Sequence, residues 1–242
     1  MKTVGIIGGS GYTGGELLRL VVHHPSLKLD FVYSSTRPGT FIDETHQDLL
    51  GQFDLKFTDQ INTEVDILFL CLGHGNSSKF LKNHTFSNST IIIDLSNDFR
   101  LKKDSKINKR EFVYGLPEIN RTAIKKARSI ANPGCFATAI QLALLPLASR
   151  NKLNNAVHIN ATTGSTGAGV SSSATTHFSW RNNNLSWYKP FTHQHLGEVK
   201  ETLDQAQGKN TEIIFLPQRG NFTRGIFATA YTFFEENLDD AH

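Results

Sequence analysis

The chain has 242 residues, with 25 Lys and Arg against 22 Asp and Glu, so its formal net charge is +3. This small excess is spread along the sequence and argues against a nucleic-acid partner. No run approaches the ~20 apolar residues that a membrane helix needs, and the first residues lack a signal-peptide pattern, so we expect a cytoplasmic protein without a membrane partner. The length allows two domains of modest size.

The first half of the chain alternates short apolar runs with helix-like segments, which is typical of parallel βαβ units. Strands are predicted at residues 4–7, 29–33, 66–72 and 91–95, and crossover helices at 14–23 and 76–86. Residues 96–120 contain Gly, Pro and many charged residues and are predicted to form loops and turns.

The character of the sequence changes after an Asn-Pro-Gly turn at residues 132–134. An apolar helix is predicted at 136–149, strands at 156–162, 212–216 and 225–234, and another helix near 196–206. The sequence therefore predicts an α/β protein with a parallel sheet, followed by a second domain that begins between residues 136 and 150.

A glycine-rich segment joins the first predicted strand to the first predicted helix and fits the G-x-G-x-x-G pattern. It consists of Gly9, Ser10, Gly11, Tyr12, Thr13 and Gly14. The glycines permit a tight turn and a close approach of the backbone to a pyrophosphate, and the helix N-terminus presents free N–H groups. We predict a dinucleotide site here; the alternative is a glycine turn with a purely structural role.

The end of the second predicted strand bears on the choice between NAD and NADP. The NAD-binding pattern places an acidic residue about 20 residues beyond the glycines. This chain has Ser34, Ser35 and Arg37 there and no carboxylate. Hydroxyls and a guanidinium suit a 2′-phosphate, which favours NADP(H) over the alternative of a solvent-exposed polar loop.

Cys135 is the candidate nucleophile. It follows Asn-Pro-Gly and precedes the long apolar helix, so its sulfur is expected near a helix N-terminus, which lowers a thiol pKa and favours the thiolate. The alternative is packing. Cys71 lies inside an apolar predicted strand and is expected to be inert. Two cysteines exclude a disulfide framework and a multi-cysteine metal site.

His193 and His195 are the candidate proton donors and acceptors, because a thiolate nucleophile needs such a partner. They lie on a connecting segment before an amphipathic helix. The alternative is that they are surface or metal-adjacent residues, which such a pair more often is. A zinc site is disfavoured because no third ligand stands at a characteristic spacing, so we predict no metal.

Two further segments have residue types that suit anion binding. Arg100 follows the fourth predicted strand, at the edge where doubly wound folds bind ligands, and is either a clamp for a carboxylate or phosphate or a solvated loop arginine. The segment of Ser165, Thr166 and Gly167 offers hydroxyls and N–H groups to an anion or oxyanion, or is a flexible linker.

Five segments in a fixed order are more specific together than any one of them alone. They are Gly8–Leu17, Asp94–Leu101, Tyr114–Glu118, Asn132–Cys135 and His193–His195. The set resembles the N-acetyl-gamma-glutamyl-phosphate reductases, arginine-biosynthesis enzymes related to aspartate-semialdehyde dehydrogenase. The resemblance extends from Met1 to about Tyr231.

The resemblance implies a Rossmann-type doubly wound parallel sheet in residues 1–136 that binds NADP(H). Residues 137–242 would form an α+β catalytic and subunit-contact domain in a dimer or tetramer. The implied reaction is the reduction of N-acetyl-gamma-glutamyl phosphate to N-acetylglutamate 5-semialdehyde through a cysteine thioester. An N-succinyl-glutamyl or aspartyl phosphate substrate, and a non-catalytic dinucleotide-binding protein, remain alternatives.

The resemblance also implies roles for individual residues. Cys135 matches the nucleophile, and His193 or His195 the acid and base. Arg100 matches the arginine that holds the anionic group of the substrate. Ser165, Thr166 and Gly167 match the loop near the substrate, while His74 and Gly75 match a loop on the cofactor side.

The sequence departs from the family pattern at two places. Gln194 stands where the family usually has an arginine between the two histidines, which puts an anion contact from that position in doubt. Family members also continue well beyond the strand predicted at 225–234, so we expect the second domain to be C-terminally shortened.

Overall fold

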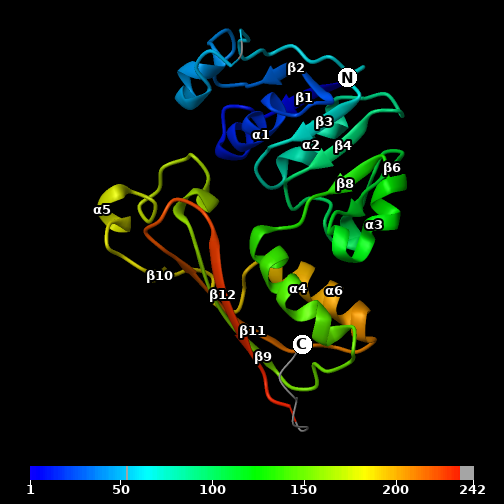
Figure 1. The fold of residues 1–242 in the computed structure, drawn as a ribbon, viewed down its shortest axis with the longest axis vertical. Coiled ribbons are helices and arrows are strands. Elements are labelled where there is room, and N and C mark those ends of the chain that lie inside the picture. The colour runs from blue at the N-terminus through cyan, green and yellow to red at the C-terminus, as the bar shows by residue number, and fades with distance from the viewer. Residues whose placement is uncertain (53, 235–242) are drawn as a thin grey trace. The chain divides into compact units, whose positions relative to one another are not determined.

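The computed structural model describes residues 1–52 and 54–234, and the chain divides into two units, Met1–Pro133 and Gly134–His242 (Figure 1). The first unit contains a six-stranded sheet in the order β2-β1-β3-β4-β8-β7, and every neighbouring pair in it is parallel. Its strands are β1 (Lys2–Ile7), β2 (Leu27–Tyr33), β3 (Ile67–Leu70), β4 (Ile91–Asp94), β7 (Val113–Tyr114) and β8 (Ser129–Ala131). The Rossmann-type parallel sheet predicted for this part of the chain is confirmed.

Alternate residues of β1 face opposite sides of this sheet, because side chains in a strand point alternately to its two faces. Val4 and Ile6 pack with Leu18 of α1 (Tyr12–Val22), whereas Ile7 belongs to a second core with Leu81 of α2 (Asn76–Asn83). Helices therefore cover both faces, which is the doubly wound arrangement. The strand order reverses between β1 and β3, so the loops after these two strands flank the switch point where such folds bind ligands.

Residues 96–120 are where the sequence-based interpretation was wrong. They contain the hairpin of β5 (Lys106–Ile107) and β6 (Arg110–Glu111), then β7 and the start of α3 (Pro117–Lys126). Strand β8 was also not predicted. Strands of two or three residues are too short to show an alternating pattern, and their pairing is set by distant neighbours rather than by local sequence.

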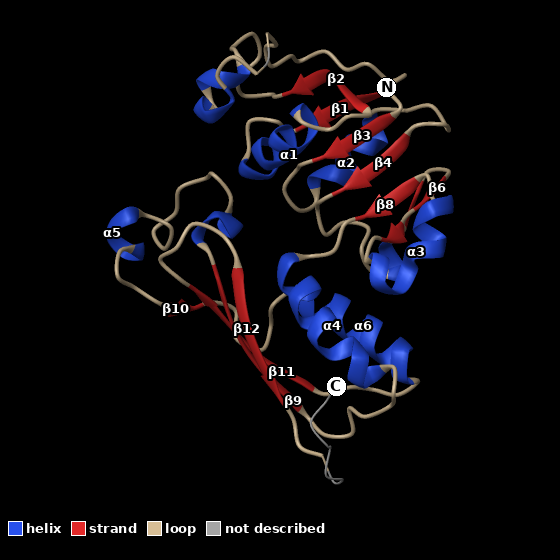
Figure 2. Cartoon of the chain, viewed as in Figure 1, coloured by secondary structure: helices blue, strands red, loops and turns tan. Residues whose placement is uncertain are grey.

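The second unit is a mixed sheet with helices α4 (Cys135–Ala148) and α6 (His195–Gln207) on one side of it (Figure 2). The strand order is β10-β11-β9-β12, with β9 and β11 parallel and the two outer strands antiparallel to their neighbours. The bounds are β9 (Val157–Thr163), β10 (Ser186–Trp187), β11 (Ile213–Arg219) and β12 (Ile226–Tyr231), with the short helix α5 (Phe178–Arg181) before β10. This confirms the predicted α+β character of the second half.

Buried side chains fix the two helices of this unit against each other and against the sheet. Gln141 of α4 donates from its side-chain nitrogen to the carbonyl of Glu198 (3.0 Å) and to the hydroxyl of Thr202 (3.1 Å), both on α6. Phe136 of α4 meets Phe215 of β11 edge to face, with ring centroids 5.2 Å apart. The N-terminal ends of α4 and α6 are thereby held together, and both bear predicted site residues. No helix in the described ranges is long and apolar enough to cross a membrane.

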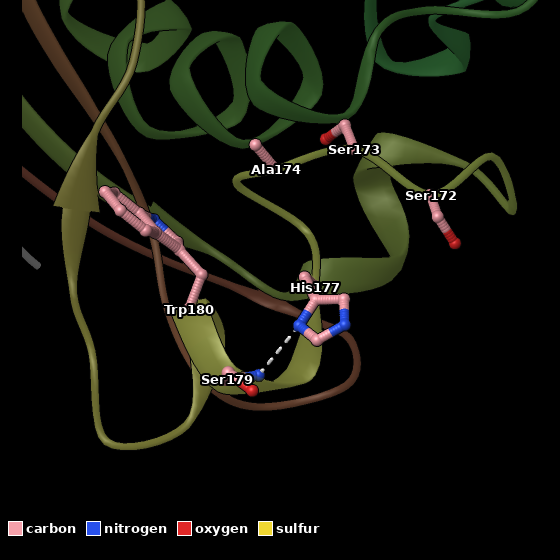
Figure 3. Close-up of a pocket in the computed structure, with 6 residues that line it drawn as sticks. All are labelled: Ser172, Ser173, Ala174, His177, Ser179 and Trp180. Carbon is pink, nitrogen blue, oxygen red and sulfur yellow. Dashed lines mark hydrogen bonds between the residues drawn. The ribbon is translucent and has the colours of Figure 1, made fainter.

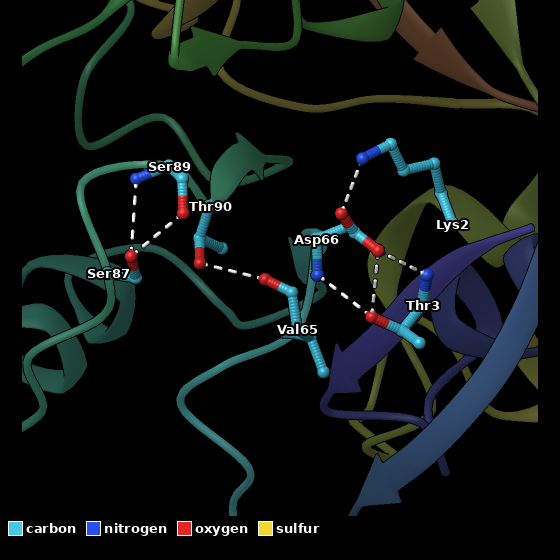
Figure 4. A network of polar contacts seen from close by, with 7 residues as sticks. All are labelled: Lys2, Thr3, Val65, Asp66, Ser87, Ser89 and Thr90. Carbon is cyan, nitrogen blue, oxygen red and sulfur yellow. Dashed lines mark hydrogen bonds and ion pairs between the residues drawn. The ribbon is translucent and has the colours of Figure 1, made fainter.

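Asp66 joins the amino ends of β1 and β3 (Figure 4). Its carboxylate accepts hydrogen bonds from the Lys2 ammonium (2.6 Å) and from the backbone N–H (2.9 Å) and hydroxyl (3.1 Å) of Thr3. Thr90, just before β4, donates its hydroxyl to the carbonyl of Val65 (2.8 Å). The Lys2 ammonium, with the two Thr3 donors, lowers the pKa of Asp66 to about 2.

We expect the Asp66 contacts to stabilise the fold in a pH-dependent way. Because the folded pKa lies below that of an unfolded aspartate, about 3.9, the stabilisation is complete above pH ~4 and is lost as the pH falls toward 2. Asp66→Asn should therefore lower the urea midpoint at pH 7, and its difference from the wild type should shrink below pH ~4. Asp54→Asn, at an exposed aspartate, is the control. A difference that is constant between pH 7 and pH 3 would contradict this account.

Candidate active site

The glycine-rich loop leaves the end of β1 and enters α1 directly. The backbone N–H groups of Gly8 and Gly9 both donate to the carbonyl of Tyr33 at the end of β2, at 3.0 Å. Gly8 has φ +83°, a conformation that glycine adopts without strain. A Cβ at Gly14 would lie 2.6 Å from the carbonyl oxygen of Gly8, so only glycine lets the first turn of α1 approach the loop this closely. The loop thus presents backbone and helix N-terminus where a pyrophosphate would bind.

The segment after β2 is connected to this loop through hydroxyls. The Ser10 and Ser34 hydroxyls are hydrogen-bonded at 2.9 Å, and Ser34 is buried. Ser35 and Arg37 are exposed, with Arg37 three residues beyond Ser34. Ser34 therefore shapes the loop from within, while Arg37 is exposed to solvent.

His74 and Gly75 follow β3, on the other side of the switch point. Gly75 has φ +79° and precedes α2, and its N–H donates to the Asp98 carboxylate at 2.6 Å. Asp98 also accepts from the N–H of Ser78 (2.9 Å), and the N–H of Asn97 donates to Nδ1 of His74 (3.2 Å). The predicted loops after β3 and β4 thus lie together, with Asp98 capping α2.

His46 is a residue of this region that the sequence analysis missed. It is buried, and its Nε2 lies 2.8 Å from the carbonyl oxygen of Gly9. A Cβ at Gly15 would come within 2.6 Å of the His46 ring, so the imidazole packs directly on the first turn of α1. A two-bond contact between the Arg19 guanidinium and the Asp48 carboxylate (2.6 and 2.8 Å) holds the same segment. No local pattern indicates this contact, because the two segments are 37 residues apart.

Arg100 is 6% exposed, so it is not a solvated loop arginine. Its Nε donates to the carbonyl of Asn132 (2.8 Å) and one of its terminal nitrogens to the carbonyl of Leu95 (2.9 Å). Both bonds go to backbone of the first unit. Arg100 therefore ties the end of β4 to the segment that leads to Cys135.

Cys135 is the first residue of α4 and is exposed, so the predicted helix N-terminal position is confirmed. Gly134 is the N-cap, and its carbonyl accepts from the N–H (2.8 Å) and hydroxyl (3.0 Å) of Thr138. The N–H groups of a first helical turn have no partner within the helix. Groups of this kind can donate to an oxyanion that forms next to a sulfur at the helix N-terminus.

Both candidate histidines are buried in the second unit rather than on the surface, with exposures of 4% for His193 and 6% for His195. Their ring centroids are 4.7 Å apart, edge to face. Nδ1 of His193 accepts from the backbone N–H of His195 (3.2 Å), while the ring of His195 lies on Gly134: a Cβ at Gly134 would be 2.5 Å from its Nε2. The pair thus stands beside the residue that precedes Cys135.

Glu198 is a second residue that the sequence analysis missed. It is 4% exposed and accepts a hydrogen bond from the N–H of Gly134 at 2.8 Å through its carboxylate. It lies three residues after His195 on α6, so both side chains project from the same side of the helix. Helix α6 therefore fixes Gly134 twice, by a ring and by a carboxylate. The His-x-x-Glu spacing at the start of a predicted helix was the available signal.

The segment of Ser165, Thr166 and Gly167 is not a flexible linker. The N–H of Ser165 donates to the carbonyl of Phe222 (2.8 Å), and the hydroxyl of Thr166 to the carbonyl of Thr223 (2.7 Å). These bonds join the loop after β9 to the loop between β11 and β12. Both loops leave the end of the parallel β9–β11 pair.

A separate hollow of about 540 Å³ lies in the segment before and within α5 (Figure 3). It is lined by Ser172, Ser173, Ala174, His177, Ser179 and Trp180. Nδ1 of His177 accepts from the N–H of Ser179 (3.2 Å) and so caps the short helix. None of the predicted site residues lines this hollow.

We expect the two cysteines to differ strongly in reactivity. Cys71 follows β3 with a partly buried side chain, and burial raises the pKa of its thiol to about 12. Its thiolate is therefore absent at neutral pH, while Cys135 is exposed at a helix N-terminus. Iodoacetamide at pH 7 should label Cys135 first, as measured by peptide mass spectrometry, and Cys135→Ser should abolish the fast phase. Equal labelling of both residues in the folded protein would contradict this expectation.

Family models match both parts of the chain. The model described as semialdehyde dehydrogenase, NAD binding domain, matches residues 3–127, and the one described as semialdehyde dehydrogenase, dimerisation domain, matches residues 135–242. Among solved structures, aspartate semialdehyde dehydrogenase II of Vibrio cholerae, complexed with ASA, has a TM-score of 0.71 at 16% identity, covering 99% of this chain and 76% of that one. The Candida albicans enzyme with NADP has a TM-score of 0.65 at 13% identity, covering 100% of this chain and 74% of that one. These two structures share the fold.

Sequence relatives are much closer. A protein of Flavobacterium johnsoniae named N-acetyl-gamma-glutamyl-phosphate reductase is 61% identical over 240 residues, which are 99% of this chain and 74% of the relative. A protein of the same name from Christiangramia forsetii is 57% identical over 242 residues, 100% of this chain and 74% of the relative. The order of motifs, the parallel sheet and the cysteine at the start of α4 agree with these similarities. The chain belongs to the N-acetyl-gamma-glutamyl-phosphate reductase family.

Proposed function

We propose that this chain is an NADP-dependent acyl-phosphate reductase that converts N-acetyl-gamma-glutamyl phosphate to N-acetylglutamate 5-semialdehyde in arginine biosynthesis. The observation that carries the proposal is the position of Cys135 at the N-terminus of α4, with the His195 ring and the Glu198 carboxylate both on the preceding residue. Relatives that are 61% and 57% identical carry the name of this activity.

The first unit fits the cofactor. The close approach of Gly14 to Gly8 leaves a bare backbone surface at the helix N-terminus, which suits a pyrophosphate. Ser34, Ser35 and Arg37 suit the 2′-phosphate that distinguishes NADP from NAD. NADPH, when bound, supplies a hydride. We assign cofactor binding to residues 1–133 and the chemistry to the unit that begins at Gly134.

In the proposed mechanism, the Cys135 thiolate attacks the acyl carbon and phosphate leaves, which gives a thioester on the sulfur. The N–H groups of the first turn of α4 stabilise the oxyanion that forms at the acyl oxygen in this step. After reduction, Cys135 is the leaving group and departs as the thiolate, which releases the aldehyde. The attack on the acyl carbon and the reduction of the thioester each place a negative charge on the acyl oxygen. In both steps this oxyanion forms beside the positive end of the α4 dipole, which stabilises it.

We assign to His195 the donation of a proton to the departing phosphate, and to His193 the orientation of the site. The His195 ring lies on Gly134, next to the nucleophile. His193 already uses Nδ1 as an acceptor for the N–H of His195 and is surrounded by the rings of Phe136, Tyr188 and Phe215. A ring held in this way suits positioning better than proton exchange.

The anion contact that the family resemblance implies for Arg100 stays a prediction. The hydrogen bonds from Arg100 to the carbonyls of Asn132 and Leu95 support a role in positioning the segment before Cys135. The contact of Ser165, Thr166 and Gly167 with the substrate, and that of His74 and Gly75 with the cofactor, likewise stay predictions. Their loops leave the carboxyl ends of strands, where ligands bind in folds of this kind.

We also infer self-association and a cytoplasmic location. The match of residues 135–242 to a dimerisation domain supports a homo-oligomer. A mechanism that depends on a reduced cysteine thiolate requires a compartment that keeps thiols reduced, and the cytoplasm is such a compartment.

The reverse reaction tests the proposed function with stable reagents. The protein is incubated with N-acetylglutamate semialdehyde, phosphate and NADP. NADPH should form only when phosphate is present, and the absorbance of the reduced nicotinamide measures its formation. Cys135→Ser should abolish turnover and leave NADP binding unchanged, because the cofactor and the thiol belong to different units. Turnover that persists in Cys135→Ser would contradict the mechanism.

Parallel assays with aspartate semialdehyde and with N-succinylglutamate semialdehyde determine the substrate. A higher kcat/KM for either of these would replace the N-acetyl assignment. NADP binding without oxidation of any aldehyde would indicate a non-catalytic dinucleotide-binding protein.

The roles of the two histidines predict different pH profiles. His195→Gln should lower kcat by about 10²- to 10⁴-fold and remove the ionisation of the proton donor from the profile of kcat against pH. His193→Gln should lower kcat less and keep the shape of that profile. A profile that loses its ionisation only in His193→Gln would reverse the two assignments.

A further inference from the structure

Arg219 is the last residue of β11, at the carboxyl end of the parallel β9–β11 pair. It pairs in register with Thr163, which directly precedes the loop of Ser165 and Thr166. Side chains alternate along a strand, so Arg219 shares a sheet face with Phe215, four residues earlier. Phe215 contacts Phe136 of α4, which shows that this face is the one that bears Cys135.

A chain of ring contacts links the Arg219 guanidinium to the catalytic candidates. The guanidinium lies over the ring of Tyr188, 4.5 Å from its centroid. The Tyr188 ring meets the ring of His193 edge to face at 5.5 Å and lies 6.3 Å from that of Phe136, the residue after Cys135. Burial raises the pKa of Tyr188 to about 12, whereas the charge of Arg219 and a side-chain hydrogen bond with Arg219 act to lower it. One aromatic ring therefore separates Arg219 from His193.

The charge on Arg219 is not neutralised within the described part of the chain. No acidic side chain there forms an ion pair with it, and its Nε is buried without a hydrogen-bond partner. Buried N–H groups are nearly always paired, so an orphan at the edge of a site points to a ligand.

The Nε of the neighbouring Arg181 is likewise buried without a hydrogen-bond partner, but its terminal nitrogens are bonded within the unit. Arg181 is 5% exposed and donates to the carbonyl of Arg219 (2.7 Å) and to the hydroxyl of Ser186 (2.6 Å). Burial, and then the charge of Arg219, lower the pKa of Arg181. Arg181 thus fixes the backbone of Arg219 and adds a second positive charge, which an anion between β11 and Cys135 would offset.

We propose that Arg219 binds a carboxylate of the N-acylglutamyl substrate, an inference that rests on the proposed function. The substrate has two anionic groups, the phosphoryl group on the reacting carbon and the α-carboxylate, which three carbon atoms separate from the reacting carbon. The phosphoryl group leaves from the carbon that Cys135 attacks, beside the N-terminus of α4. The α-carboxylate lies further from the sulfur and needs a separate cation, and the planar fork of a guanidinium matches a carboxylate.

Substrates with and without the carboxylate test the proposal in the reverse reaction. The wild type should strongly prefer N-acetylglutamate semialdehyde to 4-acetamidobutanal, which lacks the α-carboxylate. Arg219→Gln should raise the KM for the semialdehyde at least about tenfold, with a small change in kcat, and should leave kcat/KM for 4-acetamidobutanal unchanged. Arg219→Lys keeps the positive charge but loses the planar fork of the guanidinium. Its KM for the semialdehyde should therefore lie between those of the wild type and Arg219→Gln.

Lys209→Gln is the matched control, because it also removes one positive charge from this unit. Lys209 is exposed and precedes β11, at the opposite end of the strand from Arg219. The KM values of the Lys209→Gln variant should therefore equal those of the wild type. Equal losses on both aldehydes in Arg219→Gln and Arg219→Lys would show a structural role and overturn the proposal. If Arg219→Gln raises only the KM for phosphate, Arg219 binds the phosphoryl group rather than the carboxylate, and the proposal is overturned.

Alkylation of Cys135 separates a failure of this proposal from a failure of the proposed function, because it needs no turnover. The quantity to compare is the ratio of the alkylation rate with anionic iodoacetate to the rate with neutral iodoacetamide. This ratio should be higher for the wild type than for Arg219→Gln. A loss of this ratio in Arg219→Gln but not in Lys209→Gln supports a carboxylate site at Arg219 even if no aldehyde is oxidised. An identical ratio in all three proteins would overturn it.

Discussion

The absence of a side chain at Gly134 is the constraint on which the candidate active site depends. The His195 ring occupies the space that a Cβ would fill, and the Glu198 carboxylate accepts the N–H of the same residue. Both groups come from the first turn of α6, whose packing against α4 is secured by Gln141. A ring and an acceptor thus act together on one peptide unit. They fix the point at which α4 begins and therefore the position of Cys135.

The cofactor-binding unit relies on the same kind of contact between backbone segments. Gly14 brings the first turn of α1 against the carbonyl of Gly8, and the His46 ring packs on Gly15 while it reaches the carbonyl of Gly9. A glycine loop leaves carbonyls and N–H groups without side-chain cover, so it needs partners from elsewhere in the chain. His46 and Tyr33 provide them, which keeps the loop in one shape before any ligand is present.

Features that depend on neighbouring residues could be predicted from the sequence, and features that depend on distant ones could not. Strands β1 to β4 and the start of α4 at Cys135 follow from local apolar patterns and the Asn-Pro-Gly turn. The short strands β5–β8 have no local pattern. The contacts of His46 and Glu198 join segments 37 and 64 residues apart, so their roles appear only when the chain is folded. Burial likewise excludes the solvated-loop alternative for Arg100 and the surface alternative for the histidines.

Residues of one type have different roles here because their surroundings differ. Cys71 and Cys135 are the same thiol, yet burial raises the pKa of one to about 12 while the other is exposed at a helix N-terminus. Arg100 and Arg181 donate to carbonyls and hydroxyls of their own units, which commits those donors to the fold. Arg219 stacks on Tyr188, and its buried Nε, like that of Arg181, has no hydrogen-bond partner. A guanidinium recognises an external anion with donors that the protein does not use itself, which is the basis for proposing Arg219 as a carboxylate ligand, while an anion contact of Arg100 stays a prediction.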